Sequence, residues 1–153
     1  MDVHSPSVRS KNMQAIRSKD TQPEICLRKA LHAKGFRFRL NVRDILGKLD
    51  IVLPKYQAVI FVHGCFLHGH NCHLFKLPQT RREFWQTKIS GNKLRDEMVK
   101  NNLLADGWRV AIVWECALKG RNKAAIDVLI SDLAAWLSNT QIQTIEFAGD
   151  KQT

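Results

Sequence analysis

The chain has 153 residues, of which 44% are hydrophobic, and its formal net charge is +10 at pH 7. This length suits one folded domain with a hydrophobic core, so we expect a single domain over residues 1–153. The sequence contains no apolar run long enough for a signal peptide or a membrane span, which excludes a membrane protein and predicts a cytoplasmic one. The positive charge favours DNA or RNA as partner, and a solvated basic surface without such a ligand is the alternative.

The first twenty residues are basic, and Met13 and Ile16 lie at helical spacing within them. One interpretation is an arm, residues 1–20, that lies on DNA phosphates and inserts an apolar side chain into a groove. A short surface helix that docks Met13 and Ile16 on the domain explains the pattern equally well.

A helix is predicted over residues 23–34. Thr21 can cap its first turn, Glu24 lies at capping-box spacing, and Gly35 provides a stop. Residues 36–40 alternate apolar and basic, which predicts a half-buried strand. The side chains expected to face the core are Phe36, Phe38 and Leu40.

Residues 49–53 and 58–62 are apolar and are separated by a short turn, which predicts an antiparallel hairpin. Asp50 lies inside the first of these strands. A buried aspartate is costly unless it is paired or coordinates a metal, so Asp50 is a candidate functional residue, although a position at the strand edge is an alternative.

Thr80 can cap a helix that runs to Ser90, and Gly91 and Asn92 separate or kink it from a second helix that ends at Asp106. Residues 108–114 are the strongest candidate for a buried strand, which delivers Glu115 and Cys116 to its far end.

The last predicted helix carries an apolar stripe over residues 126–137, typical of core packing. Residues 139–153 show little pattern and are expected to form a flexible tail.

Residues 63–73 contain two cysteines and four histidines. Thiolate and imidazole are the ligands that Zn²⁺ prefers in a tetrahedral shell. The predicted zinc ligands are Cys65, His70, Cys72 and, from the end of a distant strand, Cys116. His68 and His73 compete as ligands, Cys26 is left on a helix, and a cysteine loop with solvent histidines is the alternative.

A second group combines Glu24, Asp50, His63 and His68. A carboxylate within a hairpin, followed by polar groups at the end of the next strand, is typical of nucleases that use Mg²⁺, because this cation prefers oxygen ligands. Imidazole would then take over proton transfer, since no Glu-x-Lys motif follows Asp50. Each residue taken alone has a structural explanation.

Aromatic and basic residues form a third group: Phe66 and Leu67, then Phe84 and Trp85 beside Arg81, Arg82 and Lys88. Aromatic rings beside cations suit stacking on bases while the charges hold phosphates. Core packing is the alternative, above all for Phe84.

Several motifs in one order resemble the bacterial very-short-patch repair endonucleases. They are residues 9–13 (RSKNM), 19–24 (KDTQPE), 61–66 (FVHGCF), 88–89 (KI), Asn92, 95–96 (RD), 107–110 (GWRV) and 114–116 (WEC). The resemblance runs from about residue 5 to residue 137. It implies an α/β, restriction-endonuclease-like (PD-(D/E)xK-type) mixed sheet flanked by helices, with a structural zinc site.

The resemblance also implies a strand-specific endonuclease that nicks duplex DNA 5′ of the T in T:G mismatches, which arise when 5-methylcytosine deaminates. By position, Asp50 and the Val62 carbonyl would bind Mg²⁺ and His68 would transfer the proton. His63 and Glu24 would support the site, and Asp96 would orient His68. The zinc ligands would be Cys65, His70, Cys72 and Cys116.

By the same resemblance, Phe66, Leu67 and Trp85 would enter DNA from the major groove and Met13 from the minor groove. Further DNA contacts are expected from Arg81, Lys88 and Asn92. Three residues depart from the family pattern: Leu67 replaces a frequent tryptophan, Leu49 a proline, and Val62 a threonine found in some relatives.

We expect a nucleoid-associated monomer that works with mismatch-repair accessory proteins and a repair polymerase. A zinc-stabilised DNA-binding module that does not cut, and a restriction nuclease of the same fold that acts on matched DNA, are the alternatives.

Overall fold

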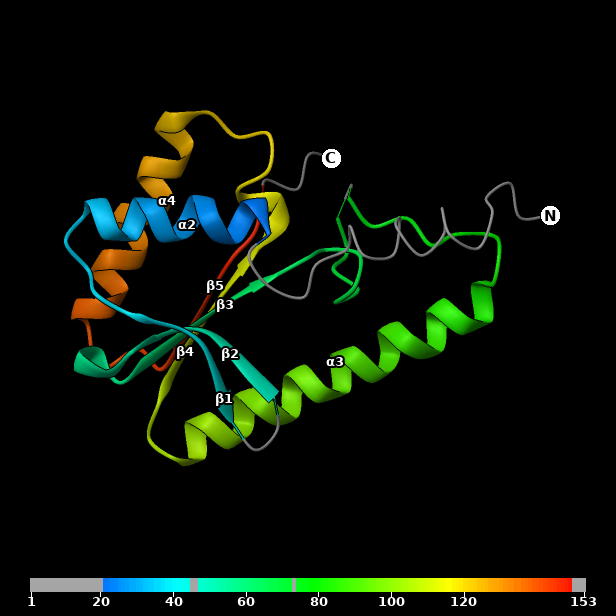
Figure 1. The fold of residues 1–153 in the computed structure, drawn as a ribbon, viewed down its shortest axis with the longest axis horizontal. Coiled ribbons are helices and arrows are strands. Elements are labelled where there is room, and N and C mark those ends of the chain that lie inside the picture. Colours follow the sequence, from blue (N-terminus) through cyan, green and yellow to red (C-terminus); the bar gives the residue numbers. More distant parts are fainter. Residues whose placement is uncertain (1–20, 45–46, 73, 150–153) are drawn as a thin grey trace.

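The fold is built on a five-stranded mixed sheet with strand order β1-β2-β3-β4-β5 (Figure 1). A computed structural model of the chain describes residues 21–44, 47–72 and 74–149. The strands are β1 (Arg39–Asp44), β2 (Gly47–Leu53), β3 (Ala58–His63), β4 (Arg109–Trp114) and β5 (Thr144–Phe147). The helices are α2 (Gln22–Ala33), α3 (Arg82–Ala105) and α4 (Lys123–Ser138), with 3-10 turns at Pro54–Tyr56 and Glu115–Ala117. The predicted α/β class is confirmed.

Strands β1, β2 and β3 pair antiparallel, while β3, β4 and β5 run parallel. The hairpin predicted from the two apolar runs is therefore confirmed, with Ile51 opposite Ile60. In the parallel pair, His63 lies opposite Trp114 at the carboxyl ends of β3 and β4. Because these ends meet at one edge of the sheet, the loop after β3 and the residues after β4 are brought together.

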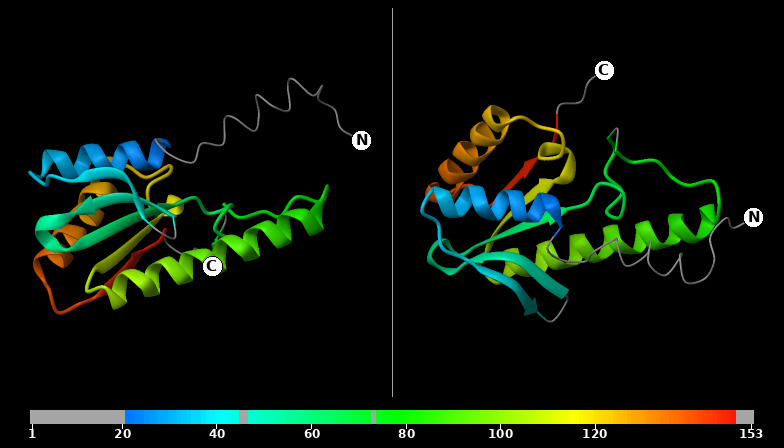
Figure 2. Two further views of the ribbon diagram at one scale, coloured as in Figure 1. Left: turned by 60° about the horizontal axis from the view of Figure 1, so that its bottom comes forward. Right: turned by 45° about the horizontal axis from the view of Figure 1, so that its top comes forward.

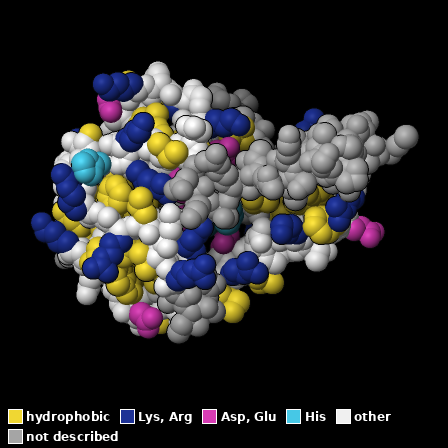
Figure 3. All heavy atoms as spheres, in the orientation of Figure 1, with side chains coloured by type: hydrophobic (Ala, Val, Ile, Leu, Met, Phe, Trp, Pro, Cys, Tyr) yellow, Lys and Arg dark blue, Asp and Glu magenta, His cyan; other side chains and the backbone are white. Residues whose placement is uncertain are grey.

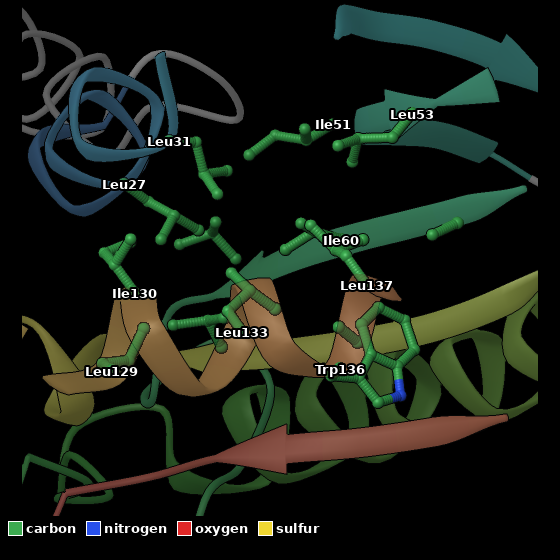
Figure 4. Close-up of a cluster of buried hydrophobic side chains, with 14 of the residues drawn as sticks. Leu27, Leu31, Ile51, Leu53, Ile60, Leu129, Ile130, Leu133, Trp136 and Leu137 are labelled. Carbon is green, nitrogen blue, oxygen red and sulfur yellow. The ribbon is translucent and has the colours of Figure 1, made fainter. Parts of the chain in front are cut away.

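Helices α2 and α4 cover one face of the sheet and α3 covers the other, as two further views show (Figure 2). Side chains alternate along β3: Ile60 and Val62 pack toward α2 and α4, whereas Val59 and Phe61 pack toward α3. Figure 4 shows the larger core, in which leucines of α2 and α4 converge on the sheet. The labelled side chains are Leu27, Leu31, Ile51, Leu53, Ile60, Leu129, Ile130, Leu133, Trp136 and Leu137.

Two helix ends show why the helices begin and end where they do. The Thr21 hydroxyl accepts a hydrogen bond from the Glu24 amide at 3.4 Å, which confirms the predicted cap of α2. At the end of α4 the buried Arg109 guanidinium donates to the carbonyls of Trp136 and Leu137, at 2.8 and 2.7 Å. A cation there satisfies carbonyls that the helix leaves without partners.

The predicted strand over residues 36–40 is displaced, because pairing begins at Arg39. Phe36 and Phe38 are half-buried against the core, but Leu40 is 41% exposed rather than buried. Leu40 lies opposite the buried Ile51, but β1 is at the edge of the sheet, where no further strand covers it.

The predicted separation of two helices at Gly91 and Asn92 is wrong, since α3 runs without interruption for 24 residues. A single glycine costs a helix only about 1 kcal/mol, which the burial of Ile89, Val99 and Leu103 on the same helix offsets. Thr80 does not cap α3; the helix follows Arg81, whose backbone is left-handed.

The expected loose tail over residues 139–153 is wrong for Thr144–Phe147, which form β5 beside β4. Ile145 and Phe147 pack against the core, and a strand of four residues is too short to show a clear period in the sequence. None of the helices in the described part of the chain is long and apolar enough to cross a membrane.

Candidate active site and metal centre

A cavity of about 530 Å³ lies where the start of α2, strands β2 and β3, the loop after β3 and helix α3 meet. It brings together residues that are far apart in the sequence. The predicted site residues that line it are Glu24, Asp50, Val62, His63, Phe66, Leu67, His68, Asn92 and Asp96. All the predicted catalytic residues therefore surround one cavity.

Asp50 is only 9% exposed in the middle of β2. The Val62 amide donates a hydrogen bond to the Asp50 Oδ2 atom at 2.9 Å. The pairing of β2 with β3 ends at Ile51 and Ile60, so beyond that pair the Asp50 side chain, not a backbone carbonyl of β2, accepts from β3. Burial raises the pKa of Asp50 from 3.8 to about 6, against the lowering effect of the Val62 hydrogen bond. The nearby Glu24 raises the pKa further. A buried carboxylate of this kind favours a hard cation that would compensate its charge.

His63 ends β3 and is 6% exposed, and its imidazole lies parallel to that of His68. The ring centroids are 4.0 Å apart and the planes differ by 4°. Burial, and then the charge of His68, lower the pKa of His63 to about 3, so His63 is neutral at physiological pH. Among the described residues, its buried Nδ1 atom has no hydrogen-bond partner.

His68 and Asp96 form a close pair, with Nδ1 and Oδ2 2.6 Å apart. Asp96 comes from α3 and His68 from the loop after β3. A carboxylate that accepts from Nδ1–H fixes the tautomer in which Nε2 carries the lone pair. This arrangement suits His68 to accept a proton at Nε2.

Three cationic side chains, Lys48, Arg95 and Lys100, also line the cavity. Figure 3 shows that Lys and Arg side chains are numerous on the face of the molecule that it displays. The three cations of the cavity were not predicted as site residues. Lys48 could have been found from the period of two along β2, because it precedes Asp50 by two residues and so shares its face. The position of Arg95 and Lys100 at the cavity depends on how α3 packs on the sheet, which no local sequence pattern predicts. Cations beside a carboxylate and imidazoles suit a phosphodiester substrate.

A separate cluster joins Cys65, His70, Cys72 and Cys116, whose ligand atoms all lie within 4.8 Å of one another. The Cys65 and Cys116 sulfurs are 3.6 and 3.5 Å from His70 Nδ1. The cluster contains His70 and not His68, which pairs with Asp96 instead. His73, the other predicted competitor, lies outside the described residues.

Three cysteine sulfurs and one imidazole nitrogen are common metal ligands, so the cluster could hold a metal ion. Burial raises the pKa of the Cys65 and Cys116 thiols. They are therefore protonated without a cation, and a bound metal would favour the thiolates.

The loop after β3 is fastened to its surroundings by hydrogen bonds. The Cys65 amide donates to Glu115 Oε1 at 3.1 Å, and Asn92 Nδ2 donates to the Leu67 carbonyl at 2.8 Å. Asn92, predicted as a DNA contact, thus uses its amide group to hold the loop on α3. Gly69 has a φ of +64°, and a Cβ there would come within 2.7 Å of Ile89. Only a glycine lets the loop approach α3 so closely.

Aromatic side chains gather between this loop and the start of α3. The ring of Phe66 meets the edge of Trp85 at 5.2 Å, and the Arg81 guanidinium lies 4.2 Å from the centre of the Phe84 ring. Lys88 is exposed on the same helix. The structure therefore brings together Phe66 and Trp85 from the predicted DNA-contacting set, whereas Met13 lies outside the described residues.

Comparison with known proteins identifies relatives of the chain. Residues 1–74 match the family model of the DNA mismatch endonuclease Vsr. The chain is 46% identical over 147 residues to the DNA mismatch endonuclease Vsr of Escherichia coli strain K12, and the match covers 94% of both chains. It is 49% identical over 117 residues to the type II nicking enzyme V.XorIIP of Xanthomonas oryzae pv. oryzae, with 76% of this chain and 86% of that protein covered. The chain belongs to the Vsr family of DNA mismatch endonucleases.

Proposed function

We propose that this chain nicks duplex DNA on the 5′ side of the T in T:G mismatches that arise when 5-methylcytosine deaminates, and so initiates very short patch repair. The observation that carries the proposal is the cavity in which Asp50, the His63–His68 stack and Asp96 meet, bordered by Phe66 and Leu67. A mixed sheet flanked by helices, with Asp50 in its hairpin, also suits a restriction-endonuclease-like fold.

The reaction is the hydrolysis of one phosphodiester bond. His68 accepts a proton from the attacking water at Nε2, because Asp96 occupies Nδ1. The Asp96 carboxylate then stabilises the imidazolium that results. His63 remains neutral against the face of His68 and adds no competing charge. Lys48 and Arg95 at the cavity wall bind the phosphates of the cut strand.

Asp50, with the Val62 carbonyl, would hold Mg²⁺, and Glu24 beside it would support this site. The buried carboxylate fits that role because its ionisation is unfavourable without a compensating charge. When bound, the cation would neutralise charge that develops on the scissile phosphate.

The mismatch is recognised by deformation of the duplex. A T:G pair stacks less well than a matched pair, so apolar side chains can open the adjacent step at lower cost. Phe66, Leu67 and Trp85 enter from the major groove, with Leu67 acting as a wedge, and Met13 approaches from the minor groove. Arg81 and Lys88 contact phosphates.

The cluster of Cys65, His70, Cys72 and Cys116 would hold a structural zinc. This ion would tie the loop that carries His68 to the residues after β4. We propose that the enzyme works as a monomer on nucleoid DNA in the bacterial cytoplasm, with accessory mismatch-repair proteins, and that a repair polymerase fills the gap opened at the nick.

The proposal is tested by mapping the cut. A duplex with one T:G pair is labelled on either strand in turn and incubated with the protein and Mg²⁺, beside its C:G control. A single cut in the T strand, 5′ of the mismatched T, is expected. Cleavage of both strands of the C:G control would support a restriction nuclease instead, and binding without any cut would support a DNA-binding module.

A further inference from the structure

The indole of Trp114, at the end of β4, touches imidazoles of both sites. It is only 8% exposed and stacks on His70 of the metal centre, with centroids 4.2 Å apart and planes 12° from parallel. Its edge meets the ring of His63 at 5.2 Å and that of His68 at 6.4 Å. One side chain therefore adjoins a candidate metal ligand and both stacked imidazoles of the cavity.

Glu146 on β5 holds this indole. The Trp114 Nε1–H donates to Glu146 Oε1, and the two residues lie on neighbouring parallel strands. Tryptophan has one side-chain donor and no acceptor, so this bond fixes the rotation of the ring. An indole with a fixed plane in turn restricts the imidazole stacked on it.

The chain after β5 makes a second contact with the metal centre. The Gly149 amide donates to the Cys116 sulfur at 3.2 Å. A Cβ on Gly149 would collide with the Cys116 carbonyl oxygen, so a glycine is required for this approach. An N–H group directed at the Cys116 sulfur restrains the position of that sulfur, as outer partners of metal ligands do.

We propose that Glu146 and Gly149, on and just after the last strand, act as a clasp on the metal centre, and that Trp114 is a positioning residue through which Glu146 orients the imidazoles of both sites. This inference rests on the proposed zinc site at Cys65, His70, Cys72 and Cys116. Glu146 sets the plane of Trp114, Trp114 sets the ring planes of His70 and of the His63–His68 stack, and Gly149 supports Cys116. The last strand, which lies outside the cavity lining, thereby affects both zinc retention and the nicking rate.

Zinc retention tests the clasp without reference to catalysis. The parent protein and the variants Glu146→Ala, Glu146→Gln and Thr144→Ala are mixed with a chelating zinc dye, and the rate of zinc loss is recorded. Removal of a side chain that supports a metal ligand typically weakens metal affinity by about 10- to 100-fold. We therefore expect Glu146→Ala to lose zinc at least about tenfold faster than the parent. Glu146→Gln keeps an acceptor for the indole and should retain zinc nearly as well as the parent. Thr144→Ala is the matched control, because Thr144 is exposed on the same strand two residues away.

The link to the cavity is tested by a double-mutant cycle. Trp114→Phe removes the indole N–H but keeps an aromatic ring beside His70. We expect it and Glu146→Ala each to lower the single-turnover nicking rate about tenfold, with little change in DNA affinity. The double variant should lose no more than the worse single one, because both changes break the same contact.

Three results would overturn the inference: equal zinc loss from Glu146→Ala and Thr144→Ala, failure of Glu146→Gln to restore retention, or additive losses of rate in the cycle. A parent protein that carries no zinc would instead overturn the metal centre itself, and the two failures are therefore distinguishable.

Discussion

The Nδ1 atom of His68 lies 2.6 Å from Asp96 Oδ2, although 28 residues separate them in the sequence. The pair exists because the loop after β3 is fixed on α3, through the Asn92 contact with the Leu67 carbonyl. His63, at the end of β3, stacks on one face of the imidazole. The base of the proposed reaction is thus held by the loop, by a helix and by a strand.

Replacing His68 by Ala should lower the single-turnover nicking rate by about 10²- to 10⁴-fold, the usual contribution of general base catalysis. Asp96→Asn should lose less, because its amide oxygen still accepts from Nδ1–H but no longer stabilises the charge. DNA affinity should stay within a few-fold of the parent in both variants, since phosphate contacts supply most of it. A His68→Ala rate close to that of the parent would assign proton transfer to another group.

Asp50→Asn should abolish nicking and stabilise the metal-free protein. A pKa raised from 3.8 to about 6 means that ionisation of Asp50 opposes folding at neutral pH, on the order of 1–3 kcal/mol. Because the folded pKa is the higher one, the stability from Asp50 is complete below pH 3.8 and is lost as the pH rises through about 6. Urea unfolding in a chelator should therefore give equal parent and variant stabilities at pH ~4 and a variant advantage at pH ~7.5.

Magnesium provides the control for that comparison. Mg²⁺ should raise the stability of the parent at pH ~7.5, where Asp50 is ionised. It should leave the stability of Asp50→Asn unchanged, because only the parent has the Asp50 carboxylate. An equal response of the two proteins to Mg²⁺ would remove Asp50 as a ligand.

Gly69→Ala should destabilise the protein by about 1–3 kcal/mol, since a left-handed alanine is strained and its Cβ would press on Ile89. Gly91→Ala is the matched control. Gly91 lies within α3, and a Cβ there would have nothing within 4 Å, so alanine should stabilise by about 0.5–1 kcal/mol. Denaturant unfolding of both variants measures the difference, and a neutral Gly69→Ala would show that the loop is not packed on α3 as described.

Cys72→Ala and Cys116→Ala should each lower the zinc content and the thermal stability of the purified protein, because the ion would join the loop to the end of β4. Cys26→Ser is the control, since Cys26 lies on α2 and is not a member of the cluster. Metal analysis by mass spectrometry decides the matter. Full zinc retention in Cys116→Ala would exclude Cys116 from the ligand shell.

Local sequence patterns predict those features whose determining residues lie close together in the sequence. The hairpin around Asp50 follows from two apolar runs and a turn, and the metal cluster follows from the density of cysteine and histidine over residues 63–73. Cys116 could be predicted as a fourth ligand because it closely follows the strongly predicted buried strand β4. The contact between His68 and Asp96 came from the resemblance, since no spacing rule joins a loop to a helix 28 residues away.

Other features depend on long-range packing that no local pattern encodes. The sequence predicts a break at Gly91, but burial of one face of α3 keeps the helix continuous. Strand β5 is recognisable only beside β4, where Ile145 and Phe147 reach the core. The roles of Trp114 and Glu146 were missed for the same reason, because each side chain finds its partners across the sheet.

We propose that the enzyme nicks mismatched DNA in preference to matched DNA. The most direct measurement is the single-turnover nicking rate, with Mg²⁺ and excess protein at one fixed salt concentration, on two duplexes that differ only in a T:G or a C:G pair. We expect rapid cutting of the T strand in the T:G duplex, little cutting of the C:G duplex, and no cutting of either by Asp50→Asn. Equal rates on the two duplexes, or a parent-like rate for Asp50→Asn, would contradict this proposal.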